Sequence, residues 1–314
     1  MTPQNIPVGA FLRARRELLQ PEDVGIVRGP HRRVSGLRRE EVARRAGISQ
    51  EYYLRLEQGR DRQPSAQVIT ALGRALLLDD DSLHYLHRLA WPVPTIESER
   101  DEDGRVPDDL VRLLGQWSDT PAYITDRHLD VVAANPLAIE MAPGFIHVGA
   151  NIILGMFTAV PTPPYLDDWE RSARALVACL RYHGDLNSRR LQDVVGALSI
   201  RSEEFRKMWA EHEARPLTSG NGRMLIDPLG WVNFRRQTLE LPGGRGHQLT
   251  VFFGDEGSPE LSAIAYLRAR INETPRSGAT ASPAQEERDE VSRNAFSATR
   301  DDSSAAVHTS RMSS

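Results

Sequence analysis

The sequence predicts an all-α bundle at the N-terminus, an α+β domain after it, and a disordered C-terminal tail. Apolar residues recur at helical spacing through the first 92 residues, whereas alternating apolar runs typical of strands begin only after residue 120. A charged segment, WPVPTIESERDEDGR, lies between the two patterns. The chain of 314 residues also exceeds the about 250–300 residues at which single cores stop growing. Two folded domains are therefore expected.

We place these domains at residues 8–92 and 107–270, with a linker at 93–106 and a disordered tail at 271–314. From Pro275 onward the chain is rich in Ser, Ala, Arg and acidic residues, with few large apolar side chains. Such a composition buries too little apolar surface to offset the entropy lost on ordering.

Composition limits where the protein can act. No apolar run approaches the about 20 residues of a membrane-spanning helix, so no membrane association is expected. The start, MTPQNIPVGAFLRARRELL, lacks the apolar core of a secretory signal, which predicts a cytoplasmic protein. The lone Cys179 excludes an intrachain disulfide and lies in an apolar helical pattern. We expect it to be a small buried side chain.

Five helices are predicted in the first domain. Apolar residues repeat at helical spacing in Gly9–Leu19, and a basic loop from Gly25 to Gly36 follows. After the second and third helices, Ser65 is expected to cap a fourth. Asp79 to Asp81 place negative charge where a fifth helix begins, which suits the helix dipole.

The second and third helices lie in LRREEVARRAGISQEYYLRLEQG, Leu37–Gly59. Ala43 is small enough for two helices to cross closely, and Gly47 supplies a left-handed conformation at the corner. Ser49 precedes the next helix as a side-chain cap. This spacing is typical of a helix-turn-helix, whose second helix enters the major groove of DNA.

Charge supports the same interpretation. The first 62 residues hold 13 arginines against 8 acidic residues, a surplus of +5 on a chain whose net charge is −4. A basic surface of this kind favours contact with phosphates. For any single arginine, however, the alternative is an exposed charge without a partner.

The register of the third helix predicts which side chains meet the bases. Tyr53 and Leu56 should face inward, which turns Gln50, Glu51 and Arg55 outward. Gln can pair with adenine, Arg with guanine, and Glu can accept from cytosine, although simple solvation is the alternative. With the flanking phosphate candidates, the predicted DNA-binding residues are Arg38, Arg39, Ser49, Gln50, Glu51, Arg55, Arg60 and Arg62.

The second domain is predicted to contain two strands, several helices and three further strands. PAYITDRHLDVVAAN forms a hairpin about the polar turn at residues 126–128, and a helical stretch interrupted near Gly184 runs from about Asp167 to Glu213. Strands return in RMLIDPLGWVNFRRQTLEL and HQLTVFFGD. The glycine strings SGNGR and LPGGRGH are interpreted as turns, because they lack the context of a phosphate loop. This order predicts an antiparallel sheet with helices over one face.

The phrases GLRREEVARRAGIS and YYLRLEQGR closely resemble XRE (lambda-repressor-like) helix-turn-helix domains. DTPAYITDRHLDVVAAN, LSIRSEEFRKMWAEHEAR and TLELPGGRGHQLTVFF extend the resemblance to MmyB-like transcription regulators, from Val8 to about Leu267. It implies an MltR-type ligand-binding domain of PAS-like fold that senses a small, fatty-acid-like molecule. One departure is Asp227, where the family usually has a histidine before proline, so any role of that histidine is in doubt.

Aromatic residues of the second domain are candidates for lining a site between sheet and helices, with a solid core as the alternative. The five proposed ligand-binding residues are Trp117, Tyr123, Phe157, Trp209 and Phe234. Since one helix-turn-helix reads only a few base pairs, a homodimer on a paired double-stranded DNA operator is expected.

Catalytic chemistry has little support. There is no Gly-x-Ser-x-Gly elbow and no convincing acid pair, and His84 and His87 lack further metal ligands in nearby sequence. We predict no catalytic residue, no metal and no cofactor. Two alternatives remain: a DNA-binding regulator whose second domain only dimerises or binds a protein, and, more remotely, an enzyme with a DNA-binding appendage.

Overall fold

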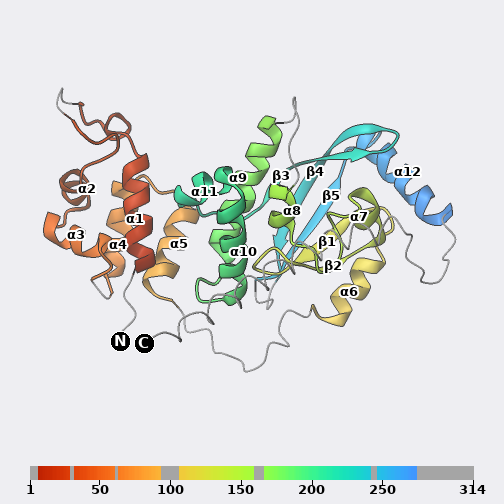
Figure 1. Cartoon of the computed structure of the whole chain (residues 1–314), viewed down its shortest axis with the longest axis horizontal. Coiled ribbons are helices and arrows are strands. Elements are labelled where there is room, and N and C mark those ends of the chain that lie inside the picture. The colour runs from red at the N-terminus through yellow and green to blue at the C-terminus, as the bar shows by residue number, and fades with distance from the viewer. Residues whose placement is uncertain are drawn as a thin grey trace, which may run out of the picture. The chain divides into compact units, whose positions relative to one another are not determined.

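A computed structural model describes residues 6–28, 32–60, 63–92, 106–158, 166–241 and 246–273 (Figure 1). Residues Met1–Ile271 group into one compact unit; of the second, Asn272–Ser314, only residues 272 and 273 are described. Nearly all of the predicted linker and tail, and the predicted turn at residues 242–244, lie outside the described residues. No helix in the described ranges is both long and apolar enough to cross a membrane.

The N-terminal part is an all-α bundle, as predicted (Figure 1). Its helices are α1 (Ile6–Leu18), the short 3₁₀ helix η1 (Pro21–Val24), α2 (Arg39–Ala46), α3 (Gln50–Glu57), α4 (Ala66–Ala75) and α5 (Asp80–Ala90). The predicted cap is present, because the Ser65 hydroxyl accepts from the Val68 amide. Asp79, which was predicted only to suit the dipole of the fifth helix, also caps that helix by accepting from the Ser82 amide. Fully buried apolar side chains, among them Phe11, join these helices in one core.

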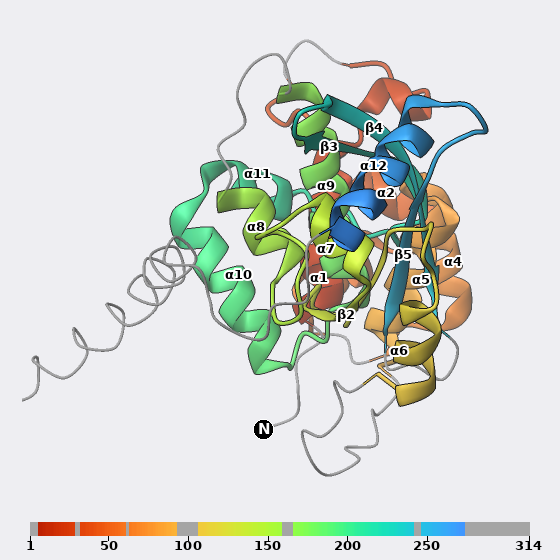
Figure 2. The same cartoon turned by 90° about the vertical axis from the view of Figure 1, so that its right-hand side faces the viewer.

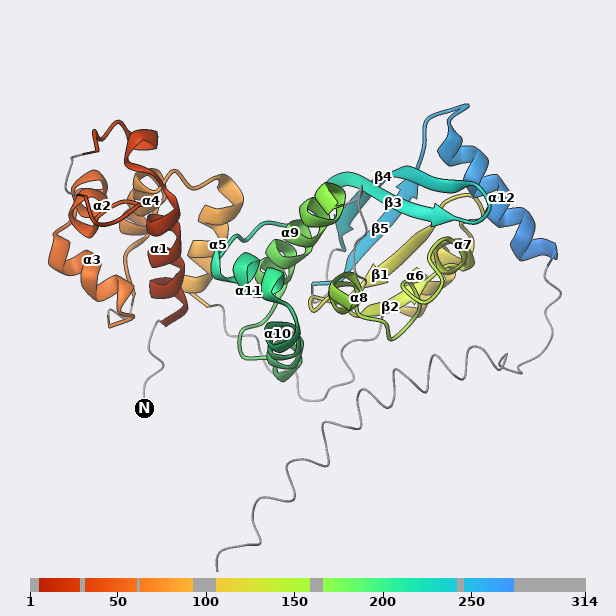
Figure 3. The same ribbon diagram turned by 45° about the horizontal axis from the view of Figure 1, so that its top comes forward.

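The C-terminal part contains a five-stranded sheet in which every neighbouring pair is antiparallel (Figure 3). The strands are β1 (Ala122–Thr125), β2 (Val131–Ala134), β3 (Ser219–Ile226), β4 (Gly230–Glu240) and β5 (Gln248–Phe253), in the spatial order β2-β1-β5-β4-β3. The predicted hairpin is the β1–β2 pair. The predicted α+β class is therefore confirmed.

Six helices contribute to the core on one face of the sheet, called here the inner face. They are α7 (Pro136–Met141), α8 (Ile152–Thr158), α9 (Leu166–His183), α10 (Arg189–Arg201), α11 (Glu203–Ala210) and α12 (Pro259–Glu273). The predicted long helical stretch is interrupted twice. One break follows His183, and the other is at Ser202, whose hydroxyl caps α11 by accepting from the Phe205 amide at 3.0 Å.

One helix corrects the prediction that helices cover a single face. α6 (Asp108–Gly115) contributes Leu114 to a separate cluster on the outer face, which also contains Ala122 and Ile124 of β1. Strand side chains alternate between faces, so Tyr123, between them in sequence, belongs to the inner core. Both faces of β1 are consequently buried.

The glycine string SGNGR is a strand and not a turn, which corrects the prediction. β3 lies beside β4 (Figure 2), and its Gly220 and Gly222 pair in register with Arg236 and Phe234 of β4. A Cβ atom at Gly222 would lie 2.6 Å from Cε1 of Phe252, closer than real Cβ contacts occur. Glycine is therefore explained here by the close approach of an aromatic ring.

Candidate nucleic-acid interface

The turn between α2 and α3 has the predicted geometry. Gly47 adopts φ = 68°, and the Ile48 amide donates to the Ala43 carbonyl at 3.0 Å, which closes α2. The Ser49 hydroxyl accepts from the Tyr52 amide at 3.1 Å and caps α3. These hydrogen bonds join residues that are close in sequence, and they set the direction of α3 relative to α2.

The face of α3 that is turned away from the core holds the predicted base-reading residues. Tyr53 and Leu56 are buried, whereas Gln50, Glu51 and Arg55 are exposed. The Arg55 guanidinium carbon lies 5.3 Å from the centre of the Tyr52 ring, and an Arg55 nitrogen is 4.0 Å from a Glu51 carboxylate oxygen. The structure brings these side chains together on one surface, while their contact with bases stays a prediction.

A buried carboxylate joins α3 to α1 and α2. Glu57 has a fully buried side chain and accepts from Nε of Arg16 and from Nε of Arg39, both at 2.6 Å. Arg16 is only 7% exposed and also donates to the Leu37 carbonyl at 2.9 Å, whereas the Arg39 side chain is 42% exposed. Glu57 therefore holds Arg39 at the surface, where its remaining guanidinium nitrogens can face a phosphate.

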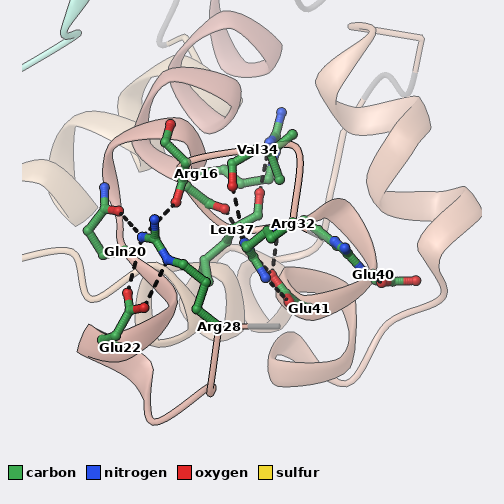
Figure 4. Close-up of polar contacts among 12 residues, drawn as sticks. Arg16, Gln20, Glu22, Arg28, Arg32, Val34, Leu37, Glu40 and Glu41 are labelled. Carbon is green, nitrogen blue, oxygen red and sulfur yellow. Dashed lines mark hydrogen bonds and ion pairs between the residues drawn. The ribbon is translucent and has the colours of Figure 1, made fainter. Parts of the chain in front are cut away.

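Two arginines of the basic loop are neutralised internally (Figure 4). Arg32 donates to both carboxylate oxygens of Glu41 at 2.6 Å, and its side chain is 4% exposed. Arg28 donates to Glu22 at 3.0 Å. Each pair joins one of the 13 arginines to one of the 8 acidic residues, so the surplus of +5 is unchanged, and these two arginines hold the loop beside η1 and α2. Among the loop residues described, Arg33 is exposed and has no polar side-chain contact with another described residue.

We predict that the neighbouring substitutions Arg32→Ala and Arg33→Ala affect different properties, the first stability and the second DNA binding. Loss of Arg32 removes a charged hydrogen bond from partly buried Glu41 and should lower unfolding free energy by about 1–3 kcal/mol. Loss of exposed Arg33 should leave stability unchanged and lower the salt slope of DNA binding by about 0.9. Urea unfolding and fluorescence anisotropy over a salt series would measure the two quantities. The reverse pattern would contradict this division of roles.

The remaining phosphate candidates differ in their surroundings. Arg38 is half exposed and its guanidinium lies 3.3 Å from the Glu40 carboxylate, an exposed pair that holds it weakly. Arg60 is exposed directly after α3, and Arg62 lies outside the described residues.

The five aromatic ligand candidates fall into three places. Tyr123 and Phe234 lie on the inner face of the sheet, each beside the ring of Phe252. Phe157 and Trp209 lie among the helices, each against Phe205, with ring centres 5.4 and 5.6 Å apart. Trp117 packs in the outer cluster with α6, so the structure does not bring it together with the other four. Their binding of a ligand stays a prediction.

Sequence reasoning missed Gln248 and Arg236, two polar residues on the inner face of the sheet. The available signal was the alternation in QLTVFF, where Gln248 and Thr250 share the buried face with Phe252. The apolar residues that alternate with Gln248, Thr250 and Phe252 point to the outer face of the sheet, where no covering helix was expected.

The fold and the exposed face of α3 define a DNA-binding protein of the helix-turn-helix class. Two family descriptions match the chain: "Helix-turn-helix domain" over residues 7–86, and "MmyB-like transcription regulator ligand binding domain" over residues 106–268. Among curated proteins, no significant match was found. Since the second description covers more than half of the chain, this chain belongs to the MmyB-like transcription regulators. Both domains are typical of transcription regulators.

Proposed function

We propose that this protein is a sequence-specific, dimeric transcription regulator whose C-terminal domain binds a small hydrophobic ligand and thereby alters DNA binding. The observation that carries the proposal is the exposed face of α3, where Gln50, Glu51 and Arg55 lie together. The match of the C-terminal domain to a ligand-binding family supports the second half.

In this proposal α3 enters the major groove and its exposed residues read base edges. Gln50 and Arg55 have the side chains that bond adenine and guanine in two places. The phosphate contacts come from Arg38, Arg39 and Arg60, and they set orientation and affinity without reading sequence. The Ser49 hydroxyl caps α3 and keeps a proton that it can donate to the DNA backbone.

The test is selection of duplexes from a random pool by the full-length protein, followed by titration of variants. Gln50→Ala and Arg55→Ala should each lose about 1–3 kcal/mol of discrimination at particular base pairs of the selected operator. Arg112→Ala, which removes an exposed charge from α6, is the matched control and should change neither affinity nor sequence preference. Equal losses on operator and random DNA for the α3 variants would remove them from base reading.

Modulation by a ligand requires a physical connection between the ligand-binding domain and the helical bundle. The end of α9 supports one, because Arg88 of α5 donates to the Tyr182 carbonyl at 2.6 Å. The Tyr182 ring also lies 6.3 Å from that of Tyr85, a residue of the N-terminal core. α9 carries Cys179 in the inner core as well, so one helix contacts both regions. A ligand can act along it only by binding two arrangements with unequal affinity.

A further inference from the structure

Within the described residues, the chain itself pairs with one edge of the five-stranded sheet but adds no strand to the other. At the β2 edge, the Val131 amide donates to the Ala150 carbonyl at 2.7 Å, and the Gly149 amide donates to the Val131 carbonyl at 2.8 Å. At the opposite edge, β3 pairs with β4 and with no other described strand. An edge of this kind presents a row of backbone donors and acceptors to which another strand can add.

The backbone pairing fixes which groups of β3 point away from β4. The Thr238 amide donates to the Thr218 carbonyl at 2.7 Å, so these two opposed residues form a hydrogen-bonded pair. Two residues further along β3, Gly220 faces Arg236 in the same register. Because hydrogen-bonded and non-hydrogen-bonded pairs alternate in an antiparallel ladder, the even-numbered residues of β3 bond to β4. The amides and carbonyls of its odd-numbered residues therefore point outward.

These odd-numbered residues form an accessible edge. They are Ser219, Asn221, Arg223 and Leu225, and all four are exposed. In the part of the chain that the structure describes, no group outside β4 forms a hydrogen bond with the backbone of Ser219, Asn221 or Leu225. The strand is eight residues long, contains no proline and has a single charged residue, so it lacks most of the features that prevent edge pairing.

We propose that β3 pairs antiparallel with β3 of a second copy of this chain, so that the two sheets join across a twofold axis at Gly222. This inference rests on the proposed function, which requires a dimer, and it assigns the dimer interface to the C-terminal domain. Most homodimers are twofold symmetric and use the same surface of both subunits. A strand edge that pairs antiparallel with itself meets this condition.

Side-chain chemistry selects the register of this pairing. With the axis at Gly222, Ser219 lies opposite Leu225 of the second copy. Asn221 lies opposite Arg223, whose guanidinium can donate to the side-chain oxygen of Asn221. An axis at Arg223 would place two arginines directly opposite each other, and like charges in that position destabilise a sheet. An axis at Asn221 would leave Leu225 without an opposite residue in β3. The axis at Gly222 avoids both costs.

The test is analytical ultracentrifugation of the full-length protein over a concentration series. Asn221→Pro removes an outward N–H but no hydrogen bond to β4, and proline is tolerated on edge strands. It should raise the dimer dissociation constant by about tenfold or more, because the twofold axis repeats the loss in both copies. Asn221→Ala is the matched control, since it keeps the N–H, and it should change dimerisation far less. Urea unfolding of both variants checks that the fold is retained.

Disulfide formation tests the register without the proline variant. The lone native cysteine, Cys179, is fully buried. A mixture of the Asn221→Cys and Arg223→Cys proteins should form a cross-linked dimer, because Cα atoms of opposite residues about 5.5 Å apart suit a disulfide. Each variant alone should cross-link less, since it meets itself only across a diagonal. If Asn221→Pro does not fold, this pattern decides the question by itself.

The outcomes separate this interface from the proposed function. A dimer unchanged by Asn221→Pro, or cross-linking of the single variants equal to that of the mixture, would overturn pairing through β3. Either result would leave a dimeric regulator that uses another surface, and the same holds if the edge is covered by a different segment of the chain. A full-length protein that stays monomeric while it binds DNA would overturn the dimeric part of the proposed function as well.

Discussion

Replacing Glu57 with alanine is expected to lower the free energy of unfolding by about 3–5 kcal/mol, the typical cost of breaking a buried ion pair. The substitution would leave the Arg16 guanidinium, which is 7% exposed, without its carboxylate. It would also release Arg39, the other arginine that Glu57 binds. Because whole domains are stable by only about 5–15 kcal/mol, the loss should appear as a large fall in the urea midpoint followed by circular dichroism.

The matched control is Glu40→Ala, which removes a carboxylate that is next to Arg39 in sequence but lies at the surface. Glu40 and Arg38 are each 47% exposed, so their pair should contribute less than about 1 kcal/mol. Glu57→Gln keeps the volume and tests charge separately from packing. If Glu57→Ala costs no more than Glu40→Ala, the buried pair does not hold the three helices together.

Removing all residues after Pro94 is expected to weaken binding to a paired operator by about 10²–10⁴-fold. A dimer makes the second half-site contact intramolecular, and the isolated bundle loses this gain if the C-terminal domain supplies the dimer interface. The measurement is fluorescence anisotropy at one salt concentration, with full-length protein and fragment titrated against the same selected operator. Equal affinity for the two proteins would defeat the dimer argument.

Two controls separate dimerisation from loss of structure. Ala214 and Tyr182 pack against the N-terminal core, so the fragment must first be shown to retain its helical circular dichroism. Fusing the fragment to a parallel coiled coil should then restore most of the lost affinity, because the coiled coil supplies the dimer. A folded fusion that remains weak would mean that the C-terminal domain contributes something other than dimerisation.

The sequence alone determined the features that depend on neighbouring residues. The left-handed glycine at Gly47 and the cap at Ser49 act within one turn of chain, so their spacing predicted α2, α3 and the exposed face of α3. The β1–β2 hairpin followed from the same kind of local signal. β3 was missed because its glycines favour turns locally, and only pairing with β4 explains them.

Tertiary structure alone decided which polar groups are neutralised and which are left without partners. Arg28, Arg32 and Arg39 looked alike as charges, yet they pair with acidic residues 6, 9 and 18 positions away. The surroundings of Trp117 on the outer face, and of Gln248 and Arg236 on the inner face, were likewise decided by how distant elements pack. Local spacing fixes the direction of a side chain along its own element. What that side chain meets depends on how distant elements pack, and no neighbouring residue encodes this.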